Sequence, residues 1–214
     1  MRDARGSVQA LTAAQGAIVD LSAAIASTDA AAIERNSARA LESGNAPAAL
    51  YEAILQSYLF VGFPRAIEAF FAAKPVLERA GAIPTAAEPP DLSGWTRSGE
   101  SLCRSVYGRN YEKLMETMRS LSPDLAASMI LEGYGKTLSR PGLPAVDREY
   151  AVIAILTVTR MWRQLRSHAI GAVNVGGSRA GVREAIERSV PWAGAEAVAQ
   201  AIRFTGVESN HAGR

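Results

Sequence analysis

An internal repeat is the sequence feature that most limits what this chain can fold into. Matching residues lie 132 positions apart, both inside expected helices and at their glycine ends: Glu52-Ala53-Ile54 with Glu184-Ala185-Ile186, Ser57 with Ser189, Gly44 with Gly176, Gly62 with Gly194, and Ala69 with Ala201. Because a duplicated segment folds into a duplicated structural unit, we expect two copies of one topology.

Each copy is expected to be helical. Alanine is abundant, β-branched residues are mostly scattered, and Gly and Pro recur at intervals of about 12 to 18 residues, the length of ordinary helices. In the first half, the expected helices run from an Asp29 cap to Glu42, from Pro47 to Leu59, and onward from Pro64. In the second half, they run from a Ser122 cap to about Gly133 and from a Ser178 cap to about Val190, and Trp192-Ala193-Gly194 separates the latter from a last helix that ends near Phe204.

The segment from Ala151 to Thr159 is the one place that also suggests a strand. It is rich in Val, Ile and Thr, but its apolar residues do not alternate with polar ones, and no second strand is evident as a partner. We therefore predict a buried helix with a break near Thr159-Arg160, and an all-α fold for the whole chain.

A change of composition divides the sequence. Pro, Gly, Ser and Thr dominate the stretch just before Gly99, which is typical of a linker. This pattern predicts an N-terminal, degenerate repeat over residues 1–80, a linker over 81–99, and a C-terminal repeat over 100–214.

Composition excludes several classes of protein. The 214 residues include 23 basic and 21 acidic ones, for a net charge of +2, without the charged blocks that nucleic-acid or lipid-surface binding uses. The longest apolar stretch, Ala151 to Val158, falls well short of the roughly 18 residues that span a bilayer. The partners expected are therefore small molecules or further subunits, with no nucleic acid and no membrane.

The N-terminal residues and the single cysteine favour the same cellular compartment. The mixed charges of residues 1–5 do not match a secretory signal, and the lone Cys103 cannot form an internal disulfide. Both observations favour a cytoplasmic protein in which Cys103 has a structural role.

The two copies differ at one chemically important position. His168, one of only two histidines, stands opposite Asn36 at the repeat offset. Because one copy keeps an ionisable group where the other has an amide, a functional site is expected in the C-terminal copy. The N-terminal copy would then supply scaffold or part of a pocket wall.

Several segments together resemble the carboxymuconolactone decarboxylase family, part of the alkylhydroperoxidase-D-like superfamily. They are Glu52 to Pro64 with its Gly-Phe-Pro turn, Tyr134-Gly135, Pro141-Gly142-Leu143, Arg148-Glu149, Gln164 to His168, and Gly171 to Gly176. The resemblance implies an orthogonal helical bundle of two related repeats. It also implies a homo-oligomer, trimeric or hexameric.

The redox relatives use a glutamate, a Cys-x-x-Cys pair and a histidine. By resemblance Glu149 and His168 match the glutamate and the histidine, whereas Met161 and Gln164 occupy the cysteine positions. Neither a thioether nor an amide can replace a thiolate in thiol-disulfide exchange. An alkylhydroperoxidase-type activity is therefore the least favoured function.

Without the thiols, the resemblance implies decarboxylation of a small carboxylated lactone, with no cofactor and no metal. His168 would donate the proton and Glu149 would orient it, as the two catalytic residues. Arg163 or Arg166 would hold a carboxylate, and the neighbouring Gln164, Met161 and Trp162 would complete the substrate site.

Structural roles compete with each of these assignments. His168 can be a satisfied core histidine, Glu149 a first-turn helix acid, and the arginines at every third position from Arg160 a solvated or inter-subunit face. Met161 and Trp162 can belong to the core. The alternative function is accordingly a small-ligand-binding or oligomeric scaffold protein that catalyses nothing.

Overall fold

The computed structural model describes residues 10–207, and these residues form helices and their connections without any strand. The expectation about a secretory signal in residues 1–5 lies outside this range. The elements in chain order are α1 (Ala13–Ser27), α2 (Ala30–Glu42), α3 (Pro47–Gln56), α4 (Tyr58–Arg79), α5 (Leu92–Tyr107), the short 3-10 turn η1 (Gly108–Asn110), α6 (Tyr111–Leu121), α7 (Pro123–Ser128), the π-helix η2 (Met129–Leu138), α8 (Ala145–Val158), α9 (Trp162–Asn174), α10 (Arg179–Arg188), α11 (Val190–Ala193) and α12 (Ala195–Thr205). The predicted all-α fold is confirmed.

The predicted duplication is also confirmed, and it extends to the backbone. Helices α1, α2, α3 and α4 begin 132 residues before α8, α9, α10 and α11, respectively. We call α1 to α4 the N-terminal repeat and α8 to α12 the C-terminal repeat.

The turns between the helices repeat as closely as the helices do. Thr28 and Arg160 both adopt a left-handed conformation, with φ of 64° and 58°. Gly62 (φ 79°, ψ 164°) and Gly194 (φ 83°, ψ 155°) share a conformation that is essentially restricted to glycine. The matching glycines in the sequence therefore mark the same sharp break in each repeat, in the N-terminal one as a kink within α4.

Side-chain caps place the helix starts where the sequence predicts them. The Asp29 carboxylate accepts a hydrogen bond from the Ala32 amide at 2.9 Å, and the Ser178 hydroxyl accepts one from the Gly181 amide at 2.9 Å. The Ser122 hydroxyl likewise caps α7. The helix after Ser122 runs further than predicted, because α7 continues beyond Gly133 as the π-helix η2.

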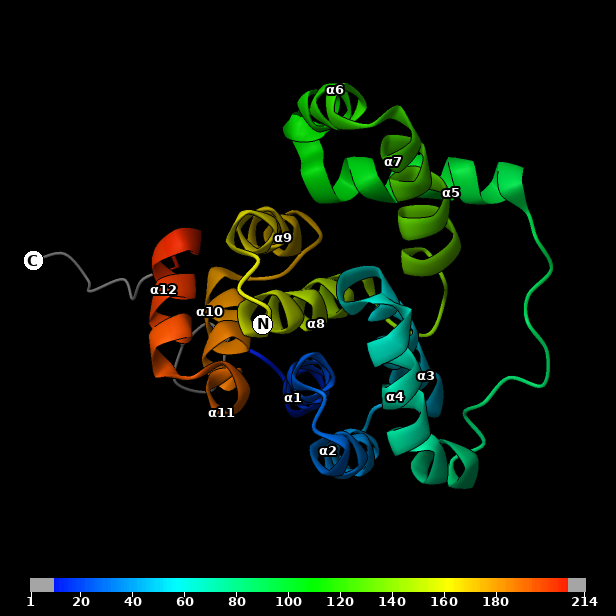
Figure 1. The fold of residues 1–214 in the computed structure, drawn as a ribbon, viewed down its shortest axis with the longest axis vertical. Helices are drawn as coiled ribbons and strands as arrows, with labels where there is room; N and C mark the ends of the chain where they lie inside the picture. The colour runs from blue at the N-terminus through cyan, green and yellow to red at the C-terminus, as the bar shows by residue number, and fades with distance from the viewer. Residues whose placement is uncertain (1–9, 208–214) are drawn as a thin grey trace, which may run out of the picture.

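Helix α8 is the buried helix that the Val- and Ile-rich segment predicts. Residues 148–157 are all buried, and the helix ends at Val158, before the left-handed turn at Arg160 that reverses the chain into α9. Helix α1 packs against α8 between the two repeats, with α2 and α4 on one side and α9 and α10 on the other (Figure 1). The two repeats thus bury their first helices against each other.

Ion pairs join the repeats at related places. Arg148 of α8 donates hydrogen bonds to Glu52 at 3.0 Å and to Gln56 at 3.2 Å on α3. Arg188 of α10 pairs with Asp20 of α1 at 2.9 Å. Both contacts therefore run from an arginine of the C-terminal repeat to residues of the N-terminal repeat.

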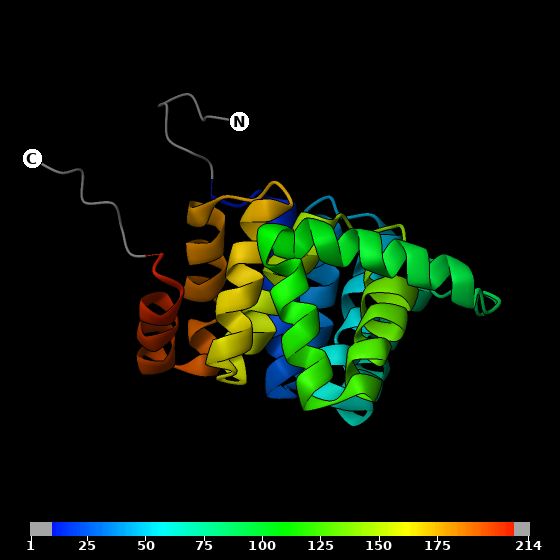
Figure 2. The same ribbon diagram turned by 90° about the horizontal axis from the view of Figure 1, so that it is seen from above.

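The segment between the repeats forms a third group of helices, α5 to η2, which we call the cover helices (residues 92–138). They lie together on one side of the molecule, and α5 runs across its edge (Figures 1 and 2). Cys103, Val106, Tyr111, Met115 and Tyr134 belong to their own apolar cluster. The predicted C-terminal unit of residues 100–214 therefore contains most of the cover helices as well as the C-terminal repeat.

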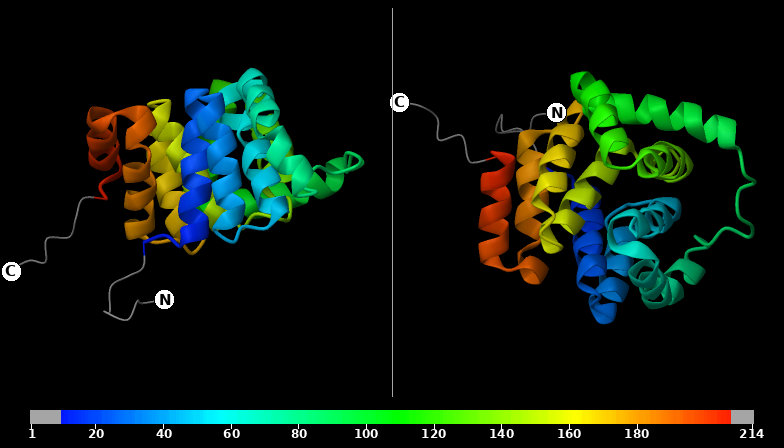
Figure 3. Two further views of the ribbon diagram at one scale, coloured as in Figure 1. Left: turned by 90° about the horizontal axis from the view of Figure 1, so that it is seen from below. Right: turned by 45° about the horizontal axis from the view of Figure 1, so that its top comes forward.

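The connection from α4 to the cover helices is shorter than the composition predicts. It follows an extended path around the edge of the molecule and ends at Asp91 (Figure 3). The Asp91 carboxylate accepts a hydrogen bond from the Gly94 amide at 2.9 Å, so that α5 begins at Leu92 despite Gly94 and Gly99. The expected linker of residues 81–99 is therefore helical in its second part.

Within residues 10–207, no helix combines the length and the apolar character that crossing a bilayer requires.

Candidate functional site

His168 and Glu149 form a buried pair. The imidazole Nδ1 of His168, on α9, lies 2.8 Å from Oε2 of Glu149, on α8. Only 5% of His168 and 4% of Glu149 is exposed. The two residues that the resemblance selects as catalytic are thus in direct contact.

A glycine on α9 makes room for the glutamate. A Cβ atom added at Gly171, one turn after His168, would lie 3.0 Å from Oε2 of Glu149 and 2.6 Å from the Val106 side chain. Both separations are tighter than van der Waals contact permits. Gly171 therefore lets α9 approach α8 and the cover helices closely enough to enclose the Glu149 carboxylate.

The contact with Glu149 determines which ring nitrogen of His168 donates a hydrogen bond. Because a carboxylate only accepts hydrogen bonds, Nδ1 of His168 acts as the donor to Glu149 and Nε2 remains for a ligand. The edge of the His168 ring meets the Phe60 ring, with centroids 5.5 Å apart and an interplanar angle of 84°. The N-terminal repeat thus helps to orient the histidine.

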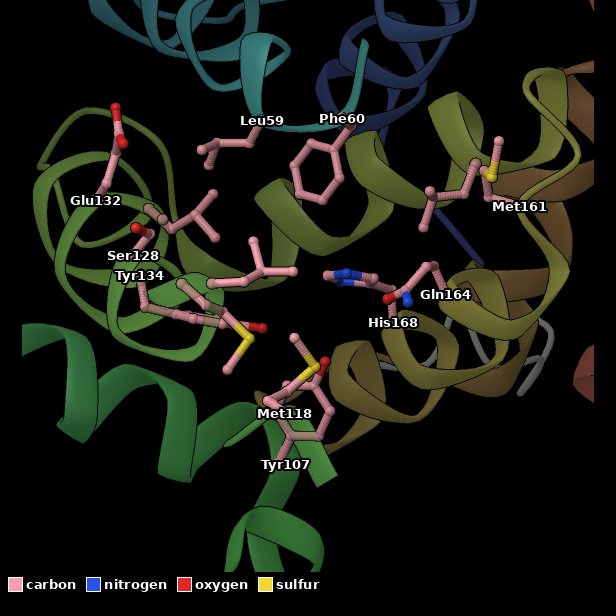
Figure 4. A pocket seen from close by; sticks show the side chains of 15 residues that line it. Leu59, Phe60, Tyr107, Met118, Ser128, Glu132, Tyr134, Met161, Gln164 and His168 are labelled. Atoms are coloured by element: carbon pink, nitrogen blue, oxygen red, sulfur yellow. The ribbon is translucent and has the colours of Figure 1, made fainter. Parts of the chain in front are cut away.

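A cavity of about 490 Å³ opens beside His168 (Figure 4). Three parts of the chain line it: the start of α4, the cover helices, and the adjoining ends of α8 and α9. The lining residues are Leu59, Phe60, Tyr107, Met118, Leu125, Ser128, Met129, Glu132, Gly133, Tyr134, Leu138, Leu156, Met161, Gln164 and His168. The volume suits a small organic molecule.

The lining is mostly apolar, with flexible methionines and few polar groups. Among the described residues that line the cavity there is no Lys or Arg. Glu132 contributes a carboxylate at the rim, but Figure 4 shows it pointing away from the cavity centre, and it accepts a hydrogen bond from Tyr58 at 3.4 Å. An anionic ligand would therefore meet no Lys or Arg side chain in this lining.

The residues that the sequence predicted to bind the substrate lie on different faces of α9. Met161 and Gln164 lie seven and four residues before His168, on the same helix face, and both line the cavity. Arg163 and Arg166 are exposed on another face, and Trp162 stacks on Phe204 with centroids 6.0 Å apart. The structure thus brings Met161 and Gln164 to the pair but not Arg163, Arg166 or Trp162.

Sequence reasoning missed the cavity wall opposite α9. Tyr107 and Tyr134 come from α5 and η2, and Leu59 and Phe60 come from the N-terminal repeat. Tyr134 is part of the motif that carries the resemblance, but no local signal marks Tyr107. Leu59 and Phe60 lie in the Glu52 to Pro64 segment of the resemblance, but the sequence indicated only that the degenerate repeat would form part of a pocket wall.

Cys103 is a core residue of the cover helices. It is fully buried, and burial raises the pKa of its thiol to about 12. A nucleophilic cysteine requires the opposite shift, toward the thiolate. This environment supports the structural role expected for Cys103.

Comparison with known proteins finds a family similar to the C-terminal part of the chain. The sequence profile described as "Carboxymuconolactone decarboxylase family" matches residues 123–206, which contain Glu149, His168 and η2. This C-terminal part of the chain is thus similar to the carboxymuconolactone decarboxylase family, in agreement with the resemblance found in the sequence.

A named relative also matches the chain. Over 147 residues the chain is 30% identical to a protein of Schizosaccharomyces pombe described as "Peroxisomal protein 2". The aligned region covers 64% of each protein, so the chain spans less than two thirds of the length of that relative.

Proposed function

We propose that this protein is a cofactor-independent enzyme that transfers a proton to or from a carbon next to a carbonyl group in a small, mostly apolar molecule. The contact between His168 and Glu149, enclosed beside the cavity, carries the proposal. His168 is the acid and base, and Glu149 orients its ring and stabilises the protonated imidazole.

Decarboxylation of a carboxylated lactone belongs to this chemistry. The carbon–carbon bond to the carboxylate breaks, carbon dioxide leaves, and its electron pair remains on the lactone as a dienolate. That dienolate then takes a proton from His168. The family profile supports this reaction as a candidate, and it ends in the same proton transfer.

The cavity lining bears on which lactone would suit. Burying a carboxylate without a partner is costly, and no described lining residue is Lys or Arg. A molecule with two carboxylates is thus disfavoured relative to one with a single carboxylate or none.

Two assays run together test this proposal. One follows the decarboxylation of 4-carboxymuconolactone by its ultraviolet absorbance. The other follows deuterium uptake from heavy water beside the carbonyl of 3,4-dihydrocoumarin, an uncharged lactone, by proton NMR. We expect enzyme-dependent deuterium uptake, a fall of about 10²- to 10⁴-fold in His168→Ala, and a smaller fall in Glu149→Gln. Circular dichroism establishes that both variants fold.

An undiminished rate in a folded His168→Ala variant would refute the assignment of the histidine. If the parent protein turns over neither compound, the non-catalytic alternative gains the advantage.

One observation favours that alternative, an oligomeric scaffold. Phe63, Ile67 and Phe71 lie at four-residue intervals on α4 and are exposed, so they form an apolar stripe. The expected trimer or hexamer stays a prediction. Light scattering on the parent and on a Phe71→Ser variant would test whether this stripe joins subunits, with a lower mass for the variant as the supporting result.

A further inference from the structure

Two tyrosines form the polar end of the cavity opposite the histidine. Tyr107 is the last residue of α5, and Tyr134 lies in the middle of the π-helix η2. Their rings meet edge to face, with centroids 6.3 Å apart and an interplanar angle of 75°. In Figure 4 both hydroxyl groups end inside the cavity, on the side toward His168.

Both tyrosines are protonated over the neutral pH range. Burial raises the pKa of Tyr107 to about 12, and the Tyr134 hydroxyl beside it opposes only part of that shift. Burial also raises the pKa of Tyr134 well above its ordinary value. Each side chain therefore presents an O–H group that can donate a hydrogen bond.

These hydroxyls differ from those of other tyrosines that the fold uses. The Tyr150 hydroxyl accepts a hydrogen bond from the Ser178 amide at 2.9 Å, and the Tyr58 hydroxyl lies 2.7 Å from that of Thr137. In the described part of the chain, neither Tyr107 nor Tyr134 is hydrogen-bonded to a backbone group or a charged side chain. The two hydroxyls interact with each other, so that the pair keeps one O–H group free to donate into the cavity.

The remaining lining decides which acceptor suits this donor pair. A carbonyl oxygen needs donors but no counter-ion, and the cavity provides donors in an otherwise apolar wall. A carboxylate would need a permanent cation, and no described lining residue is Lys or Arg. The pair therefore matches the oxygen of an uncharged group.

We infer that Tyr107 and Tyr134 bind the carbonyl oxygen of an uncharged lactone, ester or ketone, and so hold the neighbouring carbon toward His168. The inference rests on the proposed function for the reaction that follows, but binding can be measured without turnover. Hydrogen bonding from this tyrosine pair would also stabilise the negative charge that develops on this oxygen when the neighbouring carbon loses its proton.

Three matched compounds test this selectivity by NMR titration with the parent protein. They are 3,4-dihydrocoumarin, chroman, which has a methylene group in place of the carbonyl, and chroman-2-carboxylate, which adds a charge. We expect dihydrocoumarin to bind about tenfold more tightly than chroman, since one well-placed hydrogen bond contributes about that factor. Chroman-2-carboxylate is expected to bind more weakly than either.

The second part of the binding experiment removes the tyrosine hydroxyls one at a time. In Tyr107→Phe the affinity for dihydrocoumarin is expected to fall about tenfold while the affinity for chroman stays unchanged, and Tyr134→Phe should act in the same direction. Tyr111→Phe is the matched control, because Tyr111 belongs to the cover helices but lies beneath the Arg104 guanidinium and does not line the cavity.

The outcomes separate this inference from the proposed function. Equal affinity for dihydrocoumarin and chroman, or no measurable binding of dihydrocoumarin, would overturn the inference even if Tyr107→Phe did not fold. Tight binding that depends on Tyr107 and persists in His168→Ala would support it, whether or not the parent protein catalyses proton transfer.

Discussion

The two repeats share a backbone but not a site. The left-handed turns at Thr28 and Gly44 recur at Arg160 and Gly176, and the break at Gly62 recurs at Gly194. At the positions of Glu149 and His168, however, the N-terminal repeat has Ala17 and Asn36. The residues that form the turns are thus present twice, whereas the pair proposed to transfer the proton is present once.

The surroundings of His168 and Asn36 also differ between the two repeats. The cover helices enclose α9 beside His168, and the start of α4 closes the cavity with Phe60. Asn36 instead donates a hydrogen bond to the Ala32 carbonyl of its own helix. A site in this molecule therefore requires both the ionisable pair and a wall from outside the repeat, and only the C-terminal repeat has both.

The largest stability difference between the repeats is expected at their related glutamates, Glu52 and Glu184. The Glu52 and Arg148 side chains are 5% and 2% exposed, so Glu52→Ala leaves a buried arginine unpaired at a cost of about 3 to 5 kcal/mol. Glu184 and Arg188 are 29% and 31% exposed, and Glu184→Ala should cost about 1 kcal/mol or less. Urea unfolding of both variants measures the contrast, and equal losses would contradict it.

Tyr107, which lies beside the C-terminal repeat, is expected to lower the free energy of unfolding at alkaline pH. Folding raises the pKa of Tyr107 from 10.0 to about 12, so between these values the unfolded chain loses a proton that the folded chain keeps. The free energy of unfolding should accordingly be unaffected by this group below pH 10 and fall by about 2 to 3 kcal/mol as the pH rises to 12.

Tyr107→Phe removes this contribution and should flatten the alkaline limb of a plot of unfolding free energy against pH. Tyr134, whose pKa is shifted in the same direction, retains part of the slope. If the parent and Tyr107→Phe profiles ran parallel above pH 10, the hydroxyl would be less enclosed than the structure indicates.

The related glycines should respond alike, because they serve the shared backbone. Gly62→Ala and Gly194→Ala each force a side chain into a conformation that is essentially restricted to glycine, at a cost of about 1 to 3 kcal/mol. Thermal unfolding of the two single variants is the measurement. A large loss at one position and none at the other would show that the two breaks are not equivalent.

The smallest effect is expected at the position that corresponds to His168. Asn36→Ala removes one hydrogen bond to the carbonyl of its own helix turn, and should change the free energy of unfolding by about 0.5 kcal/mol or less. It should leave any catalytic rate unchanged. A loss of activity would mean that the N-terminal repeat takes part in the chemistry directly.

The parts of the fold that the sequence predicts well are those that depend on short local patterns. The caps at Asp29, Ser122 and Ser178 and the turns at Gly44 and Gly62 depend on neighbouring residues, so their positions follow from short patterns. Gly94 and Gly99 misled the linker prediction, because the Asp91 cap, three residues before Gly94, starts α5 at Leu92.

The residues of the candidate site also fall into those that the sequence predicted and those that it did not. Glu149 and His168 were predicted through the family resemblance, and so were Met161 and Gln164, which occupy the cysteine positions of the redox relatives. Tyr107 and Phe60 reach the cavity through contacts between segments distant in sequence, which no local pattern encodes. The orientation of Arg163 and Arg166 away from the cavity follows from the helix phase, which could have been applied to the sequence.

The most direct test of the account converts the site of one repeat into that of the other. Deuterium uptake by 3,4-dihydrocoumarin would be followed by NMR for the parent protein, for His168→Asn, which places the residue of the N-terminal repeat in the site, and for Asn36→Ala. We predict that His168→Asn lowers the rate by about 10²-fold or more while Asn36→Ala matches the parent. Equal rates in the parent and a folded His168→Asn variant would contradict the claim that His168 transfers the proton.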